Sequence, residues 1–310
     1  MKIDIHGHQY PEAFLKEFRP LVERGILPRP DFDFGPWEVE KHLALNDEMG
    51  IDLQVLSLTM TAYMTDPAAA LGLAQAGNEG LAEVCRRYPE RFVAFAALPL
   101  VDVEASVREV RRAAGELGMK GVILGTNVQG EPIDGEAFYP LYEEIHRLKL
   151  PVLIHPMDPK GPPQAYEHRL ELWIGWPMDT TYAAARLVLN GLLDRFPGMT
   201  LILSHLGGGT HYLLGRIMQA GRRGGTERPV LDYYREMYYD TAGPVSCSAV
   251  LCAHHLFGAE RILFGTDYPF GGEGGREYIR KAIDCVADLA FPQAEEEAIF
   301  HENARKLLAG

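Results

Sequence analysis

The chain has 310 residues, a length that suits one α/β barrel of roughly 250 residues with insertions or two smaller domains. Its formal net charge of −13 argues against nucleic acid and anionic membrane surfaces as partners. The four cysteines are scattered without CxxC spacing, and the first residues lack the basic and apolar regions of a signal peptide. Because no apolar run reaches about 18 residues, we expect no membrane span and a cytoplasmic protein with free thiols.

Short β-branched or apolar runs bounded by turn residues predict eight strands along the chain. The segments are Lys2–Ile5, Ile51–Leu58, Phe92–Leu98, Gly121–Leu124, Val152–Ile154, Thr200–Leu203, Met237–Asp240 and Arg261–Phe264. Helical periodicity fills the intervals between them and continues after the last one. The predicted helices are Glu38–Met49, Ala68–Arg87, Val103–Leu117, Phe138–Leu148, Thr180–Phe196, Tyr212–Gln219, Val245–Phe257, Glu277–Leu289 and Ala294–Leu308.

Strands that alternate with helices indicate parallel βα units. Eight such units predict a single (β/α)8 TIM barrel over residues 1–310, with a doubly wound open sheet as the alternative. The first strand is not followed by GxGxxG, which counts against a dinucleotide-binding form of that sheet.

Two proline-rich segments interrupt the alternation and predict long loops after strands 1 and 5. They are Gln9–Pro36 and Met157–Pro177. Both follow the carboxyl ends of strands, where barrel enzymes build their active sites. They are expected to act as lids or substrate walls, with plain surface insertions as the alternative.

Two histidines stand at the end of the first predicted strand. In an extended backbone, His6 and His8 point to the same side, and Gly7 between them allows a close approach. Converging imidazoles suit a divalent transition metal. A coincidental or structural pair remains the alternative until other strands supply further ligands.

Three later strands also end in residues that bind metals or transfer protons. His155 ends the fifth strand, His205 the sixth and Asp267 the eighth. In a barrel these ends meet at one mouth. Three imidazoles and one carboxylate would leave a position open, as catalytic zinc requires. Histidines on predicted helices, such as His42 and His146, are instead expected at the surface or an interface.

At this point the sequence resembles the amidohydrolase superfamily, and within it the branch of aminocarboxymuconate-semialdehyde decarboxylase and related metal-dependent decarboxylases and hydrolases. The resemblance runs almost end to end. It is carried by Asp4–His8, Arg91–Val93 with Leu98–Pro99, Gly121–Thr126, Ile154–Pro156, Gly175–Thr181, Ser204–Gly208, Gly215–Ile217, Gly265–Phe270 and Asn303–Ala304.

The resemblance implies roles for individual residues. The expected ligands of one divalent ion, most often Zn²⁺ with Mn²⁺ as the alternative, are His6, His8, His155 and Asp267. His205 would move the proton, and Asp267 would take part in catalysis as well as in binding. Some decarboxylases of the branch have Glu where His6 stands, so the His-x-His form points towards zinc and towards aminocarboxymuconate-type or hydrolytic members.

The substrate side of the site is less well defined by the resemblance. Trp173 occupies the aromatic wall position, and Trp176 and Arg169 complete the expected substrate residues. Arg29 and Arg223 are further candidates for the carboxylate, although each of these arginines could be a solvated surface residue. A leucine also follows His205, where the family decarboxylase has glycine.

Two activities follow from this site. We expect non-oxidative decarboxylation of a small unsaturated or aromatic carboxylic acid, using a metal-bound water and the His205 proton shuttle. Hydrolysis of a small lactone, ester or amide is the alternative activity. A barrel without enzymatic activity, which stores metal or acts as a scaffold, is a third possibility. Members of the branch are often homodimers, so a homodimer is expected.

Overall fold

The computed structural model describes residues 1–27, 36–58, 66–159, 161, 163–222 and 224–309. Within these residues, eight parallel strands form one sheet in the order β1-β2-β3-β4-β7-β8-β9-β10. The strands are β1 (Ile3–His8), β2 (Leu53–Ser57), β3 (Phe92–Ala97), β4 (Gly121–Gly125), β7 (Val152–His155), β8 (Leu201–Leu203), β9 (Tyr238–Asp240) and β10 (Ile262–Leu263). The predicted barrel is confirmed, because the strand order follows the chain order and every pair of neighbours is parallel.

The first strand closes the sheet against the segment that follows the last strand. The Ile5 amide donates to the Phe264 carbonyl at 2.9 Å, and the Asp267 amide donates to the His6 carbonyl at 2.9 Å. Gly7 and Tyr268 form a parallel bridge beside them. The barrel therefore closes at the same residues that were predicted to bind a metal.

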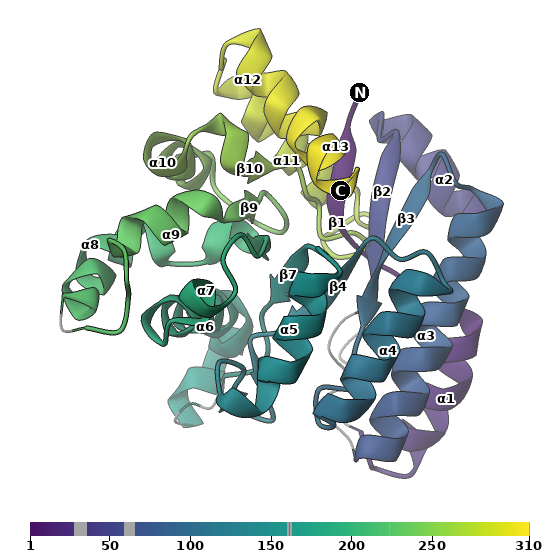
Figure 1. The fold of residues 1–310 in the computed structure, drawn as a ribbon. Helices are drawn as coiled ribbons and strands as arrows, with labels where there is room; N and C mark the ends of the chain where they lie inside the picture. The colour runs from purple at the N-terminus through teal and green to yellow at the C-terminus, as the bar shows by residue number, and fades with distance from the viewer. Residues whose placement is uncertain (28–35, 59–65, 160, 162, 223, 310) are drawn as a thin grey trace.

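The helices lie outside the sheet (Figure 1). They are α1 (Glu12–Glu23), α2 (Val39–Met49), α3 (Pro67–Arg87), α4 (Val103–Gly115), α5 (Tyr139–Arg147), α6 (Trp176–Leu189), α7 (Leu192–Arg195), α8 (Thr210–Gly221), α9 (Val230–Glu236), α10 (Cys247–Phe257), α11 (Arg276–Asp288), α12 (Gln293–Glu297) and α13 (Asn303–Leu308). Shorter helical turns are η2 (Glu136–Phe138), η3 (Pro163–Arg169), η4 (Glu171–Gly175), η5 (His205–Gly207), η6 (Ala259–Arg261) and η7 (Ala298–Glu302), and a hairpin pairs β5 (Asn127–Val128) with β6 (Glu131–Pro132).

Capping side chains set where several helices begin. The Asp66 carboxylate accepts from the amides of Ala68 and Ala69 at the start of α3, and Pro67 occupies the first turn, where the missing N–H costs nothing. Asp102 caps α4 in the same way. These signals explain why the predicted starts of α3 and α4 agree with the structure to within one residue.

The segment after β1 differs from the long loop that its prolines suggested. Helix α1 occupies Glu12–Glu23 and buries Phe14, Leu15 and Phe18, packing beside α3. Pro11 precedes the first turn, where proline is tolerated, and Pro20 is the proline that falls inside the helix. The part of the predicted loop Gln9–Pro36 that covers residues 28–35 lies outside the described residues. After β7 the prediction is closer, because η3 and η4 are irregular turns that lead into α6.

One pair of cysteines also differs from the expectation of free thiols. Cys247 at the start of α10 and Cys285 on α11 are joined as a disulfide, with Cα atoms 5.3 Å apart. A separation of 38 residues gives no motif in the sequence, and the contact arises only when α10 packs on α11.

Candidate metal centre and active site

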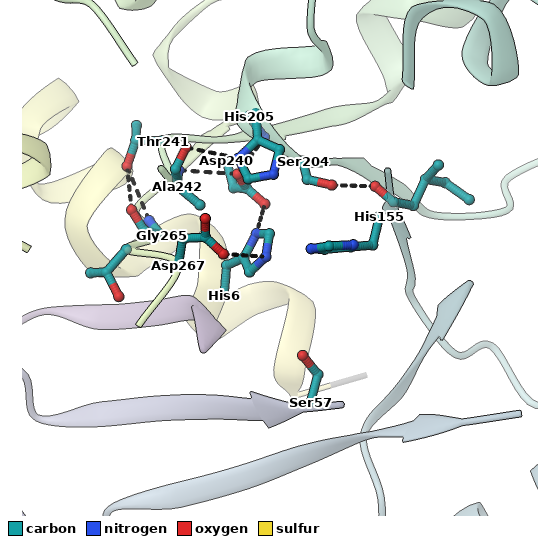
Figure 2. A network of polar contacts seen from close by, with 12 residues as sticks. His6, Ser57, His155, Ser204, His205, Asp240, Thr241, Ala242, Gly265 and Asp267 are labelled. Atoms are coloured by element: carbon teal, nitrogen blue, oxygen red, sulfur yellow. Dashed lines mark hydrogen bonds and ion pairs between the residues drawn. The ribbon is translucent and has the colours of Figure 1, made fainter. Parts of the chain in front are cut away.

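Four side chains predicted from the sequence meet at the carboxyl end of the barrel. His6 and His8 lie on β1, His155 ends β7, and Asp267 follows β10. One ligand atom from each residue lies within 4.8 Å of the ligand atoms of the other three. The three imidazoles are buried and the Asp267 side chain is 13% exposed, so solvent reaches the group mainly at Asp267. Figure 2 shows His6, His155 and Asp267 turned towards the same space.

Each of the three imidazoles has a hydrogen-bonding partner on its Nδ1 atom. The partners are Asp240 Oδ2 at 2.8 Å for His6, Ser57 Oγ at 3.0 Å for His8, and the Pro156 carbonyl at 3.0 Å for His155. Carboxylate and carbonyl oxygens only accept, and Ser57 donates its own proton to the Gly7 carbonyl. Nδ1 is therefore the protonated nitrogen in each neutral ring, and Nε2 carries the lone pair.

These Nε2 lone pairs converge. The Nε2 atoms of His6 and His8 are 2.9 Å apart, and Asp267 Oδ1 lies 3.2 Å from His8 Nε2 and 3.6 Å from His6 Nε2. Two nitrogens at this distance repel each other unless a proton or a metal ion lies between their lone pairs. Three imidazole nitrogens and one carboxylate oxygen, each held by a second partner, fit a single divalent transition metal ion.

The charge states of three of the four residues agree with that fit, and the fourth, His6, would lose a proton when a metal ion binds. Burial lowers the pKa of His8 to about 4 and holds the pKa of His155 well below its usual value, so both rings are neutral at pH 7. Burial also works against protonated His6, but the carboxylates of Asp240 and Asp267 outweigh it and raise the pKa of His6 to about 9. Burial favours the neutral form of Asp267, yet its contacts with His8 and His205 lower its pKa and keep it ionised.

Asp4 joins strand β1 to the segment that follows strand β10, next to the four ligands. It is fully buried, and its Oδ1 accepts from the amides of His6 at 3.0 Å and Thr266 at 3.1 Å. Its Oδ2 accepts from the Thr266 hydroxyl at 2.6 Å. Burial raises the pKa of Asp4 to about 6, against the opposing effect of these donors. One carboxylate thus holds the backbone next to His6 and next to Asp267.

His205 lies beside the four ligands and is not one of them. Its ring centroid is 5.3 Å from that of His6 and 5.9 Å from that of His155. Its Nδ1 lies 3.0 Å from the Ala242 carbonyl, so this nitrogen donates and Nε2 is the basic atom. The arrangement suits a group that exchanges a proton with a molecule bound at the ligand cluster.

The backbone around His205 is strained. His205, Leu206, Gly207 and Gly208 have φ values of +53°, +55°, +72° and +62°, so four consecutive residues are in the half of φ space that disfavours side chains. The Thr210 hydroxyl donates to the Gly207 carbonyl at 2.6 Å and helps to hold this turn. The leucine noted at position 206 therefore occupies a left-handed conformation that a glycine would adopt more easily.

Sequence reasoning missed the importance of Asp240. This residue ends the predicted seventh strand, as His155, His205 and Asp267 follow other strands, and this shared position was the available signal. Asp240 is fully buried and contacts both His6 and His205. An acidic residue at a strand end has no diagnostic spacing, so the sequence pattern alone does not distinguish it from a solvated cap.

The three predicted substrate residues lie in different environments. Trp176 is half-buried, with its ring centroid 6.4 Å from that of His155, and its Nε1 donates to Asp158 Oδ1 at 2.7 Å. Trp173 is 53% exposed. Arg169 forms an ion pair with Glu171 at 2.7 Å. The other two arginines considered from the sequence, Arg29 and Arg223, lie outside the described residues.

None of the helices in the described part of the chain combines the length and apolar character needed to cross a bilayer.

Comparisons with known proteins agree with the fold and the site. Residues 3–309 match the amidohydrolase family, and the chain belongs to this family. It is 32% identical over 288 residues to gamma-resorcylate decarboxylase from Rhizobium radiobacter, covering 86% of each chain. It is 30% identical over 300 residues to 2-amino-3-carboxymuconate-6-semialdehyde decarboxylase from Dictyostelium discoideum, covering 87% of this chain and 82% of that protein.

A solved structure gives the same result. The dihydroxybenzoic acid decarboxylase from Polaromonas sp. JS666, crystallised with manganese and the inhibitor 2-nitroresorcinol, superimposes with a TM-score of 0.84 at 28% identity. The match covers 99% of this chain and 96% of that one. The relatives are decarboxylases of small aromatic or unsaturated acids, which favours the expected carboxy-lyase over the hydrolase.

Proposed function

We propose that this protein is a metal-dependent decarboxylase that removes carbon dioxide from a small aromatic or unsaturated carboxylic acid without an organic cofactor. The observation that carries the proposal is the convergence of four ligand atoms within 4.8 Å, with the His205 ring beside that of His6. The family and the activities of the relatives support the same reaction.

The proposed ligands are His6, His8, His155 and Asp267. Three imidazoles favour Zn²⁺, and Mn²⁺ is the alternative because the related structure contains it. A divalent cation held there would act as a Lewis acid and stabilise negative charge on the oxygens of the bound acid. Metal analysis of protein purified without added metal, followed by reconstitution with each ion, decides between them.

The chain itself supplies the proton transfer. We assign His205 as the residue that takes up a proton from solvent at Nε2 and then donates it to the carbon bearing the carboxylate. The C–C bond to the carboxylate then breaks, its electron pair returns to the ring or double bond, and neutral carbon dioxide leaves. The Ala242 carbonyl accepts from His205 Nδ1–H and keeps the ring aimed while it gains and loses its Nε2 proton. Trp176 is the proposed aromatic wall, and Trp173, which is 53% exposed, and Arg169 lie on the same segment of the chain.

A carbon dioxide assay tests this activity. The metal-loaded enzyme is expected to release carbon dioxide from at least one acid in a panel of hydroxybenzoates and muconates that includes 2,6-dihydroxybenzoate. Metal-depleted enzyme and His205→Ala serve as controls and should release little. Turnover of lactones or amides without carbon dioxide would instead identify a hydrolase. Tight metal binding without turnover of either panel would identify a non-enzymatic barrel.

We also propose a homodimer located in the cytoplasm. Aromatic and aliphatic side chains on η4, α6 and α8 are exposed to solvent and suit a contact between copies: Trp173, Ile174, Tyr182 and Tyr212. Native mass spectrometry tests the dimer, and a monomer at micromolar concentration would contradict it. Subcellular fractionation tests the compartment, and recovery of the protein outside the cytoplasmic fraction would contradict this location.

A further inference from the structure

The two oxygens of Asp240 contact two different functional histidines (Figure 2). Oδ2 accepts from the Nδ1–H of His6 at 2.8 Å. Oδ1 accepts from the backbone amides of His205 at 2.8 Å and Ala242 at 3.1 Å. Asp240, His6 and Ala242 are all fully buried, so these bonds form away from competing water.

We propose that Asp240 is a positioning residue that fixes both the metal ligand His6 and the proton-transfer residue His205, one with each carboxylate oxygen. The inference rests on the proposed function of this site and extends it to a residue on a different strand, β9. Neither histidine is adjacent to Asp240 in sequence, so the link exists only in the folded barrel.

The contact with His6 determines which nitrogen faces the ligand cluster. A carboxylate cannot donate, so His6 must keep its proton on Nδ1 and present the Nε2 lone pair to the cation. The same contact holds the plane of the ring and makes the ligand more basic. Removing such a partner from a metal-bound histidine typically lowers metal affinity by 10–100-fold.

The contact with His205 supports a strained turn. The left-handed backbone at His205 and Leu206 is unfavourable for residues that carry a side chain, and the bond from the His205 amide to Asp240 helps to compensate for it. Because the same oxygen binds the Ala242 amide, it also places the Ala242 carbonyl where it accepts from His205 Nδ1. Asp240 therefore determines the position of the His205 backbone and, through Ala242, the orientation of its ring.

Two substitutions separate the two contacts. In Asp240→Asn, the amide oxygen can still accept from both backbone N–H groups, but an NH2 group replaces the oxygen that faces His6. Asp240→Ala removes both contacts. Asp134→Asn is the matched control, because Asp134 is also buried but binds Arg186, away from the site. Asp240→Ser replaces the alanine variant if circular dichroism shows that alanine prevents folding.

Two readouts that need no substrate test the proposal. Chelator competition is expected to give Zn²⁺ affinities at least tenfold weaker for Asp240→Asn and Asp240→Ala, and parental affinity for Asp134→Asn. In zinc-loaded protein labelled with ¹⁵N-histidine, the His205 amide resonance is expected to stay downfield in Asp240→Asn and to move upfield in Asp240→Ala.

Either of two results would overturn the proposal. One is a Zn²⁺ affinity of Asp240→Asn within twofold of the parent, and the other is a His205 amide resonance that does not move in Asp240→Ala. Neither readout depends on decarboxylation. An enzyme that releases no carbon dioxide would refute the proposed reaction and leave the test of Asp240 intact.

Discussion

The imidazole of His42 stacks on the phenol ring of Tyr268, with centroids 4.4 Å apart and an angle of 28° between the planes. Tyr268 directly follows Asp267, so this contact braces a proposed metal ligand from helix α2. His42 is only 1% exposed, and its Nδ1 accepts from Trp37 Nε1 at 3.1 Å. The surface or interface position expected from the sequence was wrong, because this face of α2 packs against the closing segment of the barrel.

The burial of His42 makes the stability of the protein depend on pH. Burial lowers the pKa of His42 to about 4, whereas the unfolded chain has a value near 6.5. The unfolded state therefore binds the proton first, and stability falls as the pH drops from about 6.5 towards 4. His42→Asn, which keeps an acceptor for Trp37, should remove about 2 kcal/mol of the loss between pH 7 and pH 5.

Urea unfolding at the two pH values measures this effect. His42→Asn is destabilised at pH 7, and its deficit relative to the parent should shrink by about 2 kcal/mol at pH 5. His146→Asn, on α5, controls for the loss of a histidine in general. An equal deficit at pH 7 and pH 5 for His42→Asn would show that His42 is not the titrating group.

Gly243 leaves room for two site residues. Its φ is +78°, and a Cβ atom there would lie 3.0 Å from His205 Nδ1 and 3.4 Å from Asp267 Oδ2. Gly243→Ala should therefore displace His205 and lower kcat at least tenfold. Gly118→Ala is the matched control, since φ is +70° and a Cβ atom would have no described neighbour within 4 Å. Both variants should lose about 1 kcal/mol of stability, and equal kcat values would contradict the steric argument.

His205→Ala should retain the metal and lose activity. The residue is not among the four converging ligands, so metal content measured by mass spectrometry should stay near one ion per chain. Loss of general acid–base catalysis is expected to lower kcat by about 10²–10⁴-fold. Full activity in this variant would remove His205 from the mechanism, and loss of the metal would make it a ligand.

The two tryptophans should contribute unequally to substrate binding. Trp176 lies 6.4 Å from His155 between ring centroids, whereas Trp173 is 53% exposed. Trp176→Ala should raise KM about tenfold, because burying an aromatic face against a substrate contributes on the order of 1–2 kcal/mol. Trp173→Ala should change KM by less than threefold. A larger increase in KM for Trp173→Ala than for Trp176→Ala would instead identify Trp173 as the aromatic residue that contacts the substrate.

Metal binding should stabilise the fold through the four ligands. At a free-ion concentration 100 times Kd, the folded state gains about 2.7 kcal/mol, which raises Tm by several degrees. Asp267→Asn should abolish most of this shift, whereas Asp134→Asn should keep it. Thermal unfolding with and without Zn²⁺ measures both, and an unchanged shift in Asp267→Asn would exclude that residue as a ligand.

The sequence predicted the parts of the site that depend on strand ends. His6, His8, His155 and Asp267 meet because parallel strands of a barrel direct their carboxyl ends to one rim. The sequence could not predict the contacts made by Asp240, because a carboxylate that bridges two histidines is defined by three-dimensional position and by no spacing along the chain.

Two helices were missed in the sequence analysis, and each omission has a local reason. Prolines suggested a loop after β1, but the apolar positions of Phe14, Leu15 and Phe18 form a buried helical face that outweighs one internal proline. Helix α9 (Val230–Glu236) was not predicted, because seven residues give too short a window for helical periodicity. In both places the local sequence pattern did not settle whether the segment is a helix or a loop, and the helix forms in the folded structure.

The closing hydrogen bond between the Asp267 amide and the His6 carbonyl joins the first strand to a residue near the end of the chain. During translation, His6 and His8 are synthesised long before Asp267. A chain truncated before Asp267 lacks the closing hydrogen bond of the barrel and the carboxylate ligand of the proposed metal site. Retention of a cation by all four ligands would therefore require every residue from His6 to Asp267 to have been synthesised.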